Sequence, residues 1–186
     1  EYPLSETGLK VLVEQRLDGD PIIHVYTPDT RRARRLVGSG ASNSVLGTDL
    51  SYEDVRYLQR FFSADNAQRM GDTDLDGHAV MVVESTPSRD DSAYTLIRSY
   101  VDKALCLPLK TEFYAANGSL HKTLLSPRDK IEMINGRGVP MHTIMLNHKY
   151  ASRSEFVITA ISFDEEIGRA SCRERVENWV VICGAK

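Results

Sequence analysis

One short run of acidic residues has the spacing of a calcium ligand set. Residues 72–77 read Asp-Thr-Asp-Leu-Asp-Gly, which matches the first half of an EF-hand loop. That loop also needs helices on both sides and a bidentate glutamate at its last position, where this chain has Val83. The flanking residues have a strand-like pattern instead. We therefore predict a β-turn with solvated carboxylates and no metal site.

No other motif in the chain predicts catalysis or a cofactor. Gly38-Ser39-Gly40 lacks the Gly-Lys-Ser/Thr ending of a phosphate-binding loop. The sequence has no Gly-x-Ser-x-Gly nucleophile elbow, which disfavours a common type of lipid hydrolase. The histidines are scattered without H-E-x-x-H or H-x-H spacing: His24, His78, His121, His142 and His148. We therefore predict a protein that is not an enzyme and that has no cofactor.

Four arginines stand close together on a predicted charged strand: Arg31, Arg32, Arg34 and Arg35. A guanidinium group binds phosphate through two parallel hydrogen bonds, so the cluster is a candidate contact for lipid headgroups or an acidic partner. The alternative is an outward-facing strand whose charges protect a sheet edge from pairing with other chains. The sequence leaves both interpretations open.

The composition excludes several classes of protein. The chain has 186 residues, of which 41% are apolar and 26% charged, so it can form a core and is not disordered as a whole. Its 23 basic and 26 acidic residues give a net charge of −3, which predicts no nucleic-acid partner. No apolar run reaches the ~18–20 residues of a membrane-spanning helix. The three cysteines have no Cys-x-x-Cys spacing, and Cys106 is expected as a small apolar side chain in or beside a strand.

Both ends of the chain look non-native. It begins at Glu1 rather than at a methionine, so we interpret it as truncated at its N-terminus. Residues 166–176 read EIGRASCRERV, which resembles a translated sequencing-library adapter. We therefore expect a body of residues 1–165 and a non-native tail of residues 166–186. The alternative is a real amphipathic helix that ends in the apolar run from Trp179 to Ile182.

Short strand-like runs separated by turn residues dominate the body. Asn117-Gly118 is the strongest hairpin signal, and Pro28-Asp29, Asp76-Gly77 and Asn135-Gly136 mark further turns. Connections this short cannot make parallel crossovers, so we predict roughly eight to ten mostly antiparallel strands.

One helix is predicted, from Ser51 onwards. Ser51 and Asp54 have the spacing of a capping box, in which two residues satisfy each other's backbone donors. The apolar residues that share one face at helical spacing are Tyr52, Val55, Leu58 and Phe62. We predict that this loop and helix form a lid through Tyr52, Val55 and Leu58, with Gly38 and Gly47 as flexible joints.

A single short helix cannot cover so many strands. We therefore predict a mainly β fold, in which a curved antiparallel sheet or half-barrel has a covering helix. A curled sheet with an apolar concave face can hold an apolar ligand. Seven residues on alternating strand positions are candidates to line that cavity: Tyr94, Leu96, Phe113, Met141, Met145, Phe156 and Ile158. An ordinary filled core is the alternative, and periodicity does not identify the concave face.

Four stretches, in order, resemble the LolA-like family of bacterial outer-membrane lipoprotein-sorting proteins. They are VYTPDTRRARRLVGS (25–39), GTDLSYEDV (47–55), DTDLDGHAVMVVESTP (72–87) and YVDKALCLPLKTEFYAANGSLHKTL (100–125). The resemblance covers about residues 20–165 and stops near Glu166. It also implies N-terminal strands and a helix ahead of Glu1.

The resemblance implies a half-barrel closed by helices, an exported periplasmic protein, and binding of lipid or lipoprotein acyl chains without catalysis. A partnership with an envelope transporter is a further expectation from the family. We therefore predict a periplasmic carrier or chaperone that buries acyl chains against the concave sheet. The alternative is a non-enzymatic envelope module that docks a transporter and has no lipid cavity.

Overall fold

The computed structural model describes residues 10–14, 22–36, 43–45, 47–54, 66–87, 92–161, 163 and 179–183. The chain divides into two compact units, Ser42–Ile158 and a smaller one that combines Glu1–Ala41 with Thr159–Lys186. Most of the predicted helix, including Val55, Leu58 and Phe62, lies outside the described residues. In the part of the chain that is described, no helix is long and apolar enough to cross a membrane.

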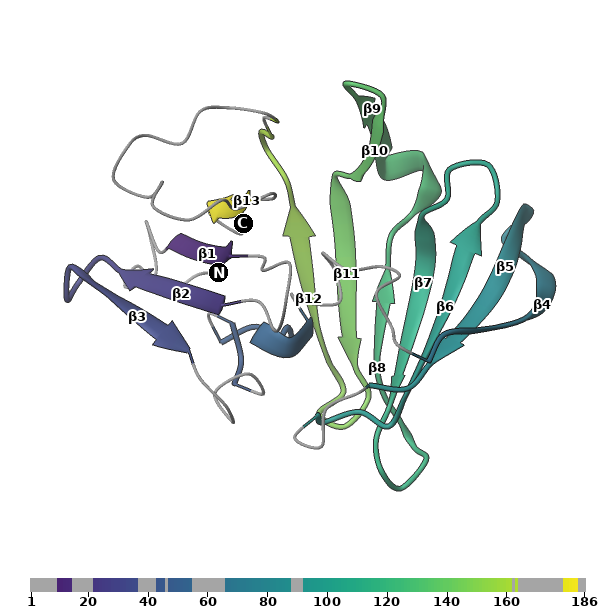
Figure 1. Ribbon diagram of the computed structural model, residues 1–186, viewed down its shortest axis with the longest axis horizontal. Coiled ribbons are helices and arrows are strands. Elements are labelled where there is room, and N and C mark those ends of the chain that lie inside the picture. Colours follow the sequence, from purple (N-terminus) through teal and green to yellow (C-terminus); the bar gives the residue numbers. More distant parts are fainter. Residues whose placement is uncertain are drawn as a thin grey trace. The chain divides into compact units, whose positions relative to one another are not determined.

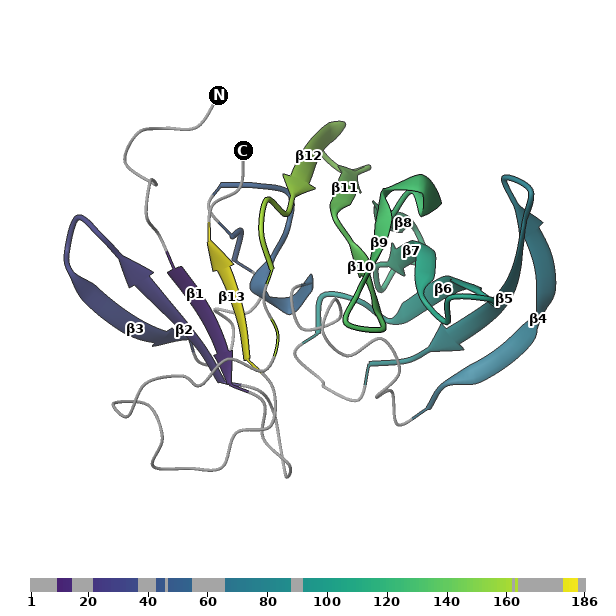
Figure 2. The ribbon, with the colours of Figure 1, turned by 90° about the horizontal axis from the view of Figure 1, so that it is seen from above.

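The larger unit is built on a seven-stranded sheet in which all neighbouring strands are antiparallel (Figure 1). Its strands, in spatial order, are β12 (Ser152–Val157), β11 (His142–Asn147), β8 (Leu120–Leu125), β7 (Pro108–Tyr114), β6 (Leu96–Asp102), β5 (His78–Ser85) and β4 (Gln68–Leu75). The sheet curves from β12 at one edge to β4 at the other (Figures 1 and 2). This confirms the predicted mainly β fold with a curved antiparallel sheet.

The predicted turn residues close the hairpins of this unit. In the β4–β5 turn, Asp76 and Gly77 have φ values of 53° and 82°, as a two-residue type I′ turn requires. The Gly77 N–H donates to Asp74 Oδ1 at 2.9 Å. The run that resembles half an EF-hand loop is therefore a hairpin between two strands, as predicted. Gly118 closes the β7–β8 hairpin with a φ of 77°.

A second hairpin, β9 (Ile131–Ile134) with β10 (Arg137–Pro140), forms a two-stranded sheet of its own. It follows a 3₁₀ turn at Arg128–Lys130, whose Arg128 Nε donates to the buried Asp102 Oδ2 at 2.7 Å. Cys106 lies between β6 and β7, and it is exposed and in the left-handed region (φ 54°). Cys106 was expected as a small apolar side chain in or beside a strand; it lies beside β7, two residues before that strand begins, but it is exposed rather than packed among apolar side chains.

The smaller unit contains a four-stranded antiparallel sheet (Figure 1). Its spatial order is β13 (Trp179–Cys183), β1 (Lys10–Glu14), β2 (Ile22–Thr27) and β3 (Arg32–Leu36). The strand at Trp179–Cys183 contradicts the alternative of a C-terminal helix through this run. That residues 166–186 form a non-native tail stays a prediction.

The two faces of the seven-stranded sheet have different chemistry. The register places Asn147, Lys122, Phe113 and Ile97 in one row across β11, β8, β7 and β6. The next row on that face contains Met145, Leu124, Thr111 and Ser99. Phe113, Leu124 and Met145 are buried, and we call this side the apolar face. The opposite side carries Arg98, Glu112 and Lys110, and we call it the charged face.

Candidate functional site

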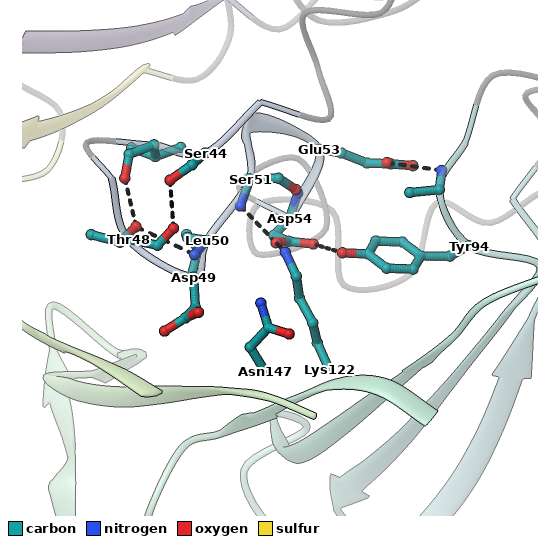
Figure 3. Close-up of polar contacts among 12 residues, drawn as sticks. Ser44, Thr48, Asp49, Leu50, Ser51, Glu53, Asp54, Tyr94, Lys122 and Asn147 are labelled. Atoms are coloured by element: carbon teal, nitrogen blue, oxygen red, sulfur yellow. Dashed lines mark hydrogen bonds and ion pairs between the residues drawn. The ribbon is translucent and has the colours of Figure 1, made fainter. Parts of the chain in front are cut away.

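Residues 43–54, which we call the strap, begin with a tight reversal of the chain. The Val45 N–H donates to the Leu50 carbonyl at 2.7 Å, and the Thr48 N–H donates to the Val45 carbonyl at 3.0 Å. Gly47 lies between them with a φ of 69°, a conformation that glycine adopts without a steric penalty. The reversal projects Asp49 from the strap toward the sheet (Figure 3).

Asp49 fixes one end of the strap to the edge strand β12. Its carboxylate accepts hydrogen bonds from Ser152 Oγ at 2.5 Å and Ser154 Oγ at 2.8 Å. The Asp49 N–H donates to Ser154 Oγ at 2.9 Å. Ser152 and Ser154 point to the same face of β12, because residues two apart in a strand share a face. The register puts that face on the apolar side of the sheet, next to Asn147 and Met145.

A capping box begins the helical turn at 52–54. The Ser51 N–H donates to Asp54 Oδ2 at 2.7 Å, and the Asp54 N–H donates to Ser51 Oγ at 3.2 Å. These reciprocal bonds satisfy two backbone donors at the helix N-terminus, where a carboxylate is also favoured by the helix dipole. The predicted start of the helix is confirmed.

The Asp54 carboxylate is the centre of a buried polar cluster (Figure 3). Its side chain has 0% exposure, and it accepts hydrogen bonds from Lys122 Nζ at 2.7 Å and the Tyr94 hydroxyl at 2.6 Å. Lys122 rises from β8, whereas Tyr94 precedes β6, so Asp54 connects the strap to two separate parts of the unit. Burial, followed by the negative charge of Asp54, raises the pKa of Tyr94 far above its ordinary value. Tyr94 is therefore a neutral donor at physiological pH.

Glu53, the neighbour of Asp54, holds the segment that leads into β6. Its carboxylate accepts from Ser92 Oγ at 2.5 Å and from the Ala93 N–H at 3.2 Å. The Tyr94 N–H donates to Ser92 Oγ at 3.1 Å, so Glu53 and Asp54 together position the Tyr94 side chain. The Tyr94 ring then packs on Phe113, with ring centroids 4.9 Å apart. The strap thus extends over the apolar face from β12 to a tyrosine that contacts β7.

The chemistry of this cluster is that of an anchor rather than a reacting centre. A buried charge is expensive unless it is paired and hydrogen-bonded, and Asp54 has both kinds of partner. No group of three or more His, Cys, Asp or Glu side chains within the described ranges has an arrangement suited to a metal ion. The cluster therefore positions the strap on the apolar face.

Three of the predicted lining residues share the apolar face. Phe113 and Met145 have 1% and 0% exposure, and Phe156 lies opposite Thr143 on the same face, half-buried at the sheet edge. Tyr94 joins them through its contact with Phe113. Met141 and Ile158 are half-buried just beyond the ends of β11 and β12, where the Ile158 N–H donates to the Met141 carbonyl at 2.8 Å. That these residues bind a ligand stays a prediction.

Leu96 does not share this face, so its expected orientation was wrong. The register pairs Ile97 with Phe113 and Leu96 with Tyr114. Successive strand residues alternate between faces, so Leu96 lies on the charged face. The error arose because Tyr94 precedes β6, so it cannot set the alternation for the strand.

The other predicted residues belong to the strap, to the smaller unit or to parts of the chain outside the described residues. Tyr52 is buried in the strap, whereas Val55 and Leu58 lie outside the described residues. The arginine cluster belongs to the smaller unit, on the β2–β3 turn and on β3, and all four side chains are exposed. The lid and headgroup roles stay predictions.

Sequence reasoning missed the ion-pair network of the charged face. Arg98 bonds Glu84 on β5 at 2.7 Å and lies 3.7 Å from Glu112 on β7. Glu112 also accepts from Lys110 Nζ at 2.6 Å and from the Tyr114 hydroxyl at 2.8 Å. Burial opposes its ionisation, but these donors and cations outweigh burial and lower the pKa of Glu112. The sequence signal was the opposite charge of residues on three neighbouring strands, and these residues can be paired only once the register is known.

Solved structures with a similar fold come from three bacteria. A DUF1329 family protein from Desulfovibrio piger has a TM-score of 0.72 and 28% identity, over 82% of this chain and 64% of its own. A candidate outer membrane lipoprotein-sorting protein domain from Vibrio parahaemolyticus has a TM-score of 0.69 and 19% identity, over 88% and 86% of the two chains. A LolA superfamily protein from Nitrosomonas europaea has a TM-score of 0.58 and 17% identity, over 83% and 84%.

The chain thus spans less than two thirds of the Desulfovibrio protein. Among curated proteins, none matches it. A family model described as an uncharacterized protein matches residues 1–171, which is most of the sequence. The chain therefore belongs to the family of that model, and it has the LolA-like fold of the lipoprotein-sorting proteins.

Proposed function

We propose that this protein carries lipid or lipoprotein acyl chains on the apolar face of its curved sheet, without catalysing a reaction. The observation that carries the proposal is the face itself. Phe113, Leu124 and Met145 are buried apolar side chains on this face of β7, β8 and β11, and the half-buried Phe156 extends the apolar face to the edge strand β12. The similarity to a lipoprotein-sorting domain from Vibrio parahaemolyticus supports this assignment.

Binding would be driven by the removal of methylene groups from water, at about 0.8 kcal/mol for each CH₂. Methionine suits such a surface, because its unbranched side chain adapts to acyl chains of different lengths. The strap would act as the lid, held over the apolar face by Asp49 at β12 and by the Asp54–Lys122 ion pair. Loading and release would require the strap to move.

A carrier of this kind only shifts equilibria, so release needs a partner that binds the chain better. An envelope transporter would fill that role. The periplasm is the compartment that this proposal implies, since acyl chains cross it only when they are shielded from water. The alternative is an envelope module that docks a transporter and binds no lipid. It predicts that the protein does not bind acyl chains.

The experiment measures displacement of a fluorescent fatty acid from the purified chain, residues 1–186, by laurate, myristate and palmitate. If methylene burial drives binding, each loss of two CH₂ groups weakens the affinity roughly 15-fold. An affinity that does not depend on chain length would overturn the proposal. Absence of any binding to delipidated protein would favour the docking module.

Two neighbouring residues of β12 supply a matched pair of variants. Phe156 lies on the apolar face, whereas Val157 lies on the charged face and is 41% exposed. Phe156→Glu should weaken palmitate binding by at least roughly tenfold, because a carboxylate then borders the buried chain. Val157→Glu adds the same charge one residue away and should leave the affinity unchanged. Equal effects of the two variants would contradict the assignment of the face.

A further inference from the structure

The strand β3 presents an unusual concentration of positive charge. β3 is the last strand in the order β13-β1-β2-β3, so β2 is its one neighbour among the described strands. Arg32, Arg34 and Arg35 lie on β3, and Arg31 immediately precedes it; all four are exposed. The chain as a whole has a net charge of −3, so this cluster is a local feature and not part of a general basic excess.

The backbone spreads the arginines around the strand edge. Arg31 has a φ of 51°, and its N–H donates to the Pro28 carbonyl at 3.1 Å, which closes the turn before β3. Arg34 pairs with Val25 of β2, and Arg35 pairs with His24. Since successive strand residues alternate, Arg34 and Arg35 point to opposite faces of the sheet. The guanidinium groups therefore fan out on both sides of the edge.

No carboxylate among the described residues forms an ion pair with any of these four arginines. The nearest acidic residue along the sequence, Asp29, is itself exposed in the turn. A guanidinium group has five donors in a planar fork that matches a phosphate group, and it is charged at every physiological pH. Because the guanidinium groups point in different directions, they suit a surface of many mobile phosphates better than a protein partner, whose carboxylates are fixed in place.

We propose that the β3 edge docks this protein on an anionic phospholipid surface through the four arginines. The inference rests on the proposed carrier function, because a carrier must approach a membrane to collect or deliver an acyl chain. The smaller unit would then supply the membrane contact, while the larger unit binds the chain. Each basic residue near an anionic bilayer strengthens the association roughly fivefold.

The test is flotation of the chain of residues 1–186 with vesicles of phosphatidylcholine, with and without phosphatidylglycerol. The protein should float only with the anionic vesicles, and salt of roughly 0.5 M should release it, because exposed charges are then screened. The double variant Arg32→Gln/Arg34→Gln should lower the partition coefficient roughly 30-fold. The matched control, Arg69→Gln/Arg153→Gln, removes the same charge from two exposed positions of the larger unit. It should float like the wild type.

Three outcomes would overturn the docking proposal: no flotation of the wild type, flotation that is equal with uncharged vesicles, or equal losses in the two double variants. Far-UV circular dichroism establishes that each variant is folded. Fatty-acid binding in solution, without vesicles, separates this proposal from the carrier function. Arg32→Gln/Arg34→Gln should keep the wild-type affinity for palmitate. If the wild type binds no palmitate, the carrier function is refuted, and the flotation result still tests docking on anionic membranes by itself.

Discussion

The Asp54–Lys122 ion pair offers the sharpest test of how the strap is held. We predict that Asp54→Asn strongly destabilises the larger unit, although the substitution preserves the size of the side chain. Asparagine retains a carbonyl oxygen that can accept from the Ser51 N–H, so the helix cap survives. What the variant loses is the negative charge that partners Lys122.

The expected magnitude follows from burial. The side chains of Asp54 and Lys122 are 0% and 9% exposed, so the ammonium group of the variant stays in the interior without a counter-charge. Loss of one partner of a buried pair costs about 3–5 kcal/mol. The double variant Asp54→Asn/Lys122→Met removes both charges and should recover most of that loss. Asp72→Asn is the control, because Asp72 pairs with Arg69 and Lys103 at an exposed site worth about 0–1 kcal/mol.

The assay is urea unfolding of the full chain, followed by far-UV circular dichroism, together with amide hydrogen exchange in residues 43–54. Asp54→Asn should lower the unfolding free energy and speed exchange in the strap. The double-mutant cycle should give a coupling energy of several kcal/mol. A cost below about 1 kcal/mol for Asp54→Asn, with unchanged exchange, would refute the view that this pair anchors the strap.

Two further predictions concern pH and a turn. Burial, with the positive charges of Lys122 and Lys149, lowers the pKa of His121 below its ordinary 6.5, so the unfolded chain takes up the proton first. The free energy of unfolding should therefore fall as the pH drops below ~6.5. The urea midpoints at about pH 7 and pH 5 should differ less in His121→Asn than in the wild type. An unchanged difference between the two midpoints would contradict the assignment of this pH dependence to His121. Gly118 has a φ of 77°, and apart from its two chain neighbours no residue has an atom within 4 Å of the position that an alanine methyl group would take. Gly118→Ala should therefore cost about 1 kcal/mol through backbone strain alone. Gly118→Asn should recover part of that loss in the same unfolding measurement, whereas an alanine variant as stable as the wild type would show that the turn conformation is unstrained.

Much of the local structure was predictable because it depends on neighbouring residues. Asp76-Gly77 and Asn135-Gly136 specify type I′ turns through their tolerance of positive φ, and these turns set the hairpins. The Ser51–Asp54 capping box depends on two residues three apart. The alternation along β7 and β11 identified Phe113 and Met145 as candidate inward-facing residues, and the register then places both on one face.

Properties that depend on register could not be read from single strands. Leu96 was assigned to the wrong face because the start of β6 was unknown, and a shift of one residue reverses the face of a side chain. The network around Glu112 joins residues of three strands, so it exists only once β5, β6 and β7 are aligned.

The sequence by itself determined the antiparallel strands, their tight turns and the helix start, because backbone preference and alternation act over a few residues. Only the tertiary structure decided where those elements meet. Asp54 and Lys122 are 68 residues apart, yet their charges meet at 2.7 Å in the interior. No local pattern marks such a pair, since the attraction that offsets the cost of removing water from both groups is strong only in the low-dielectric interior, which forms when the strap packs on the sheet.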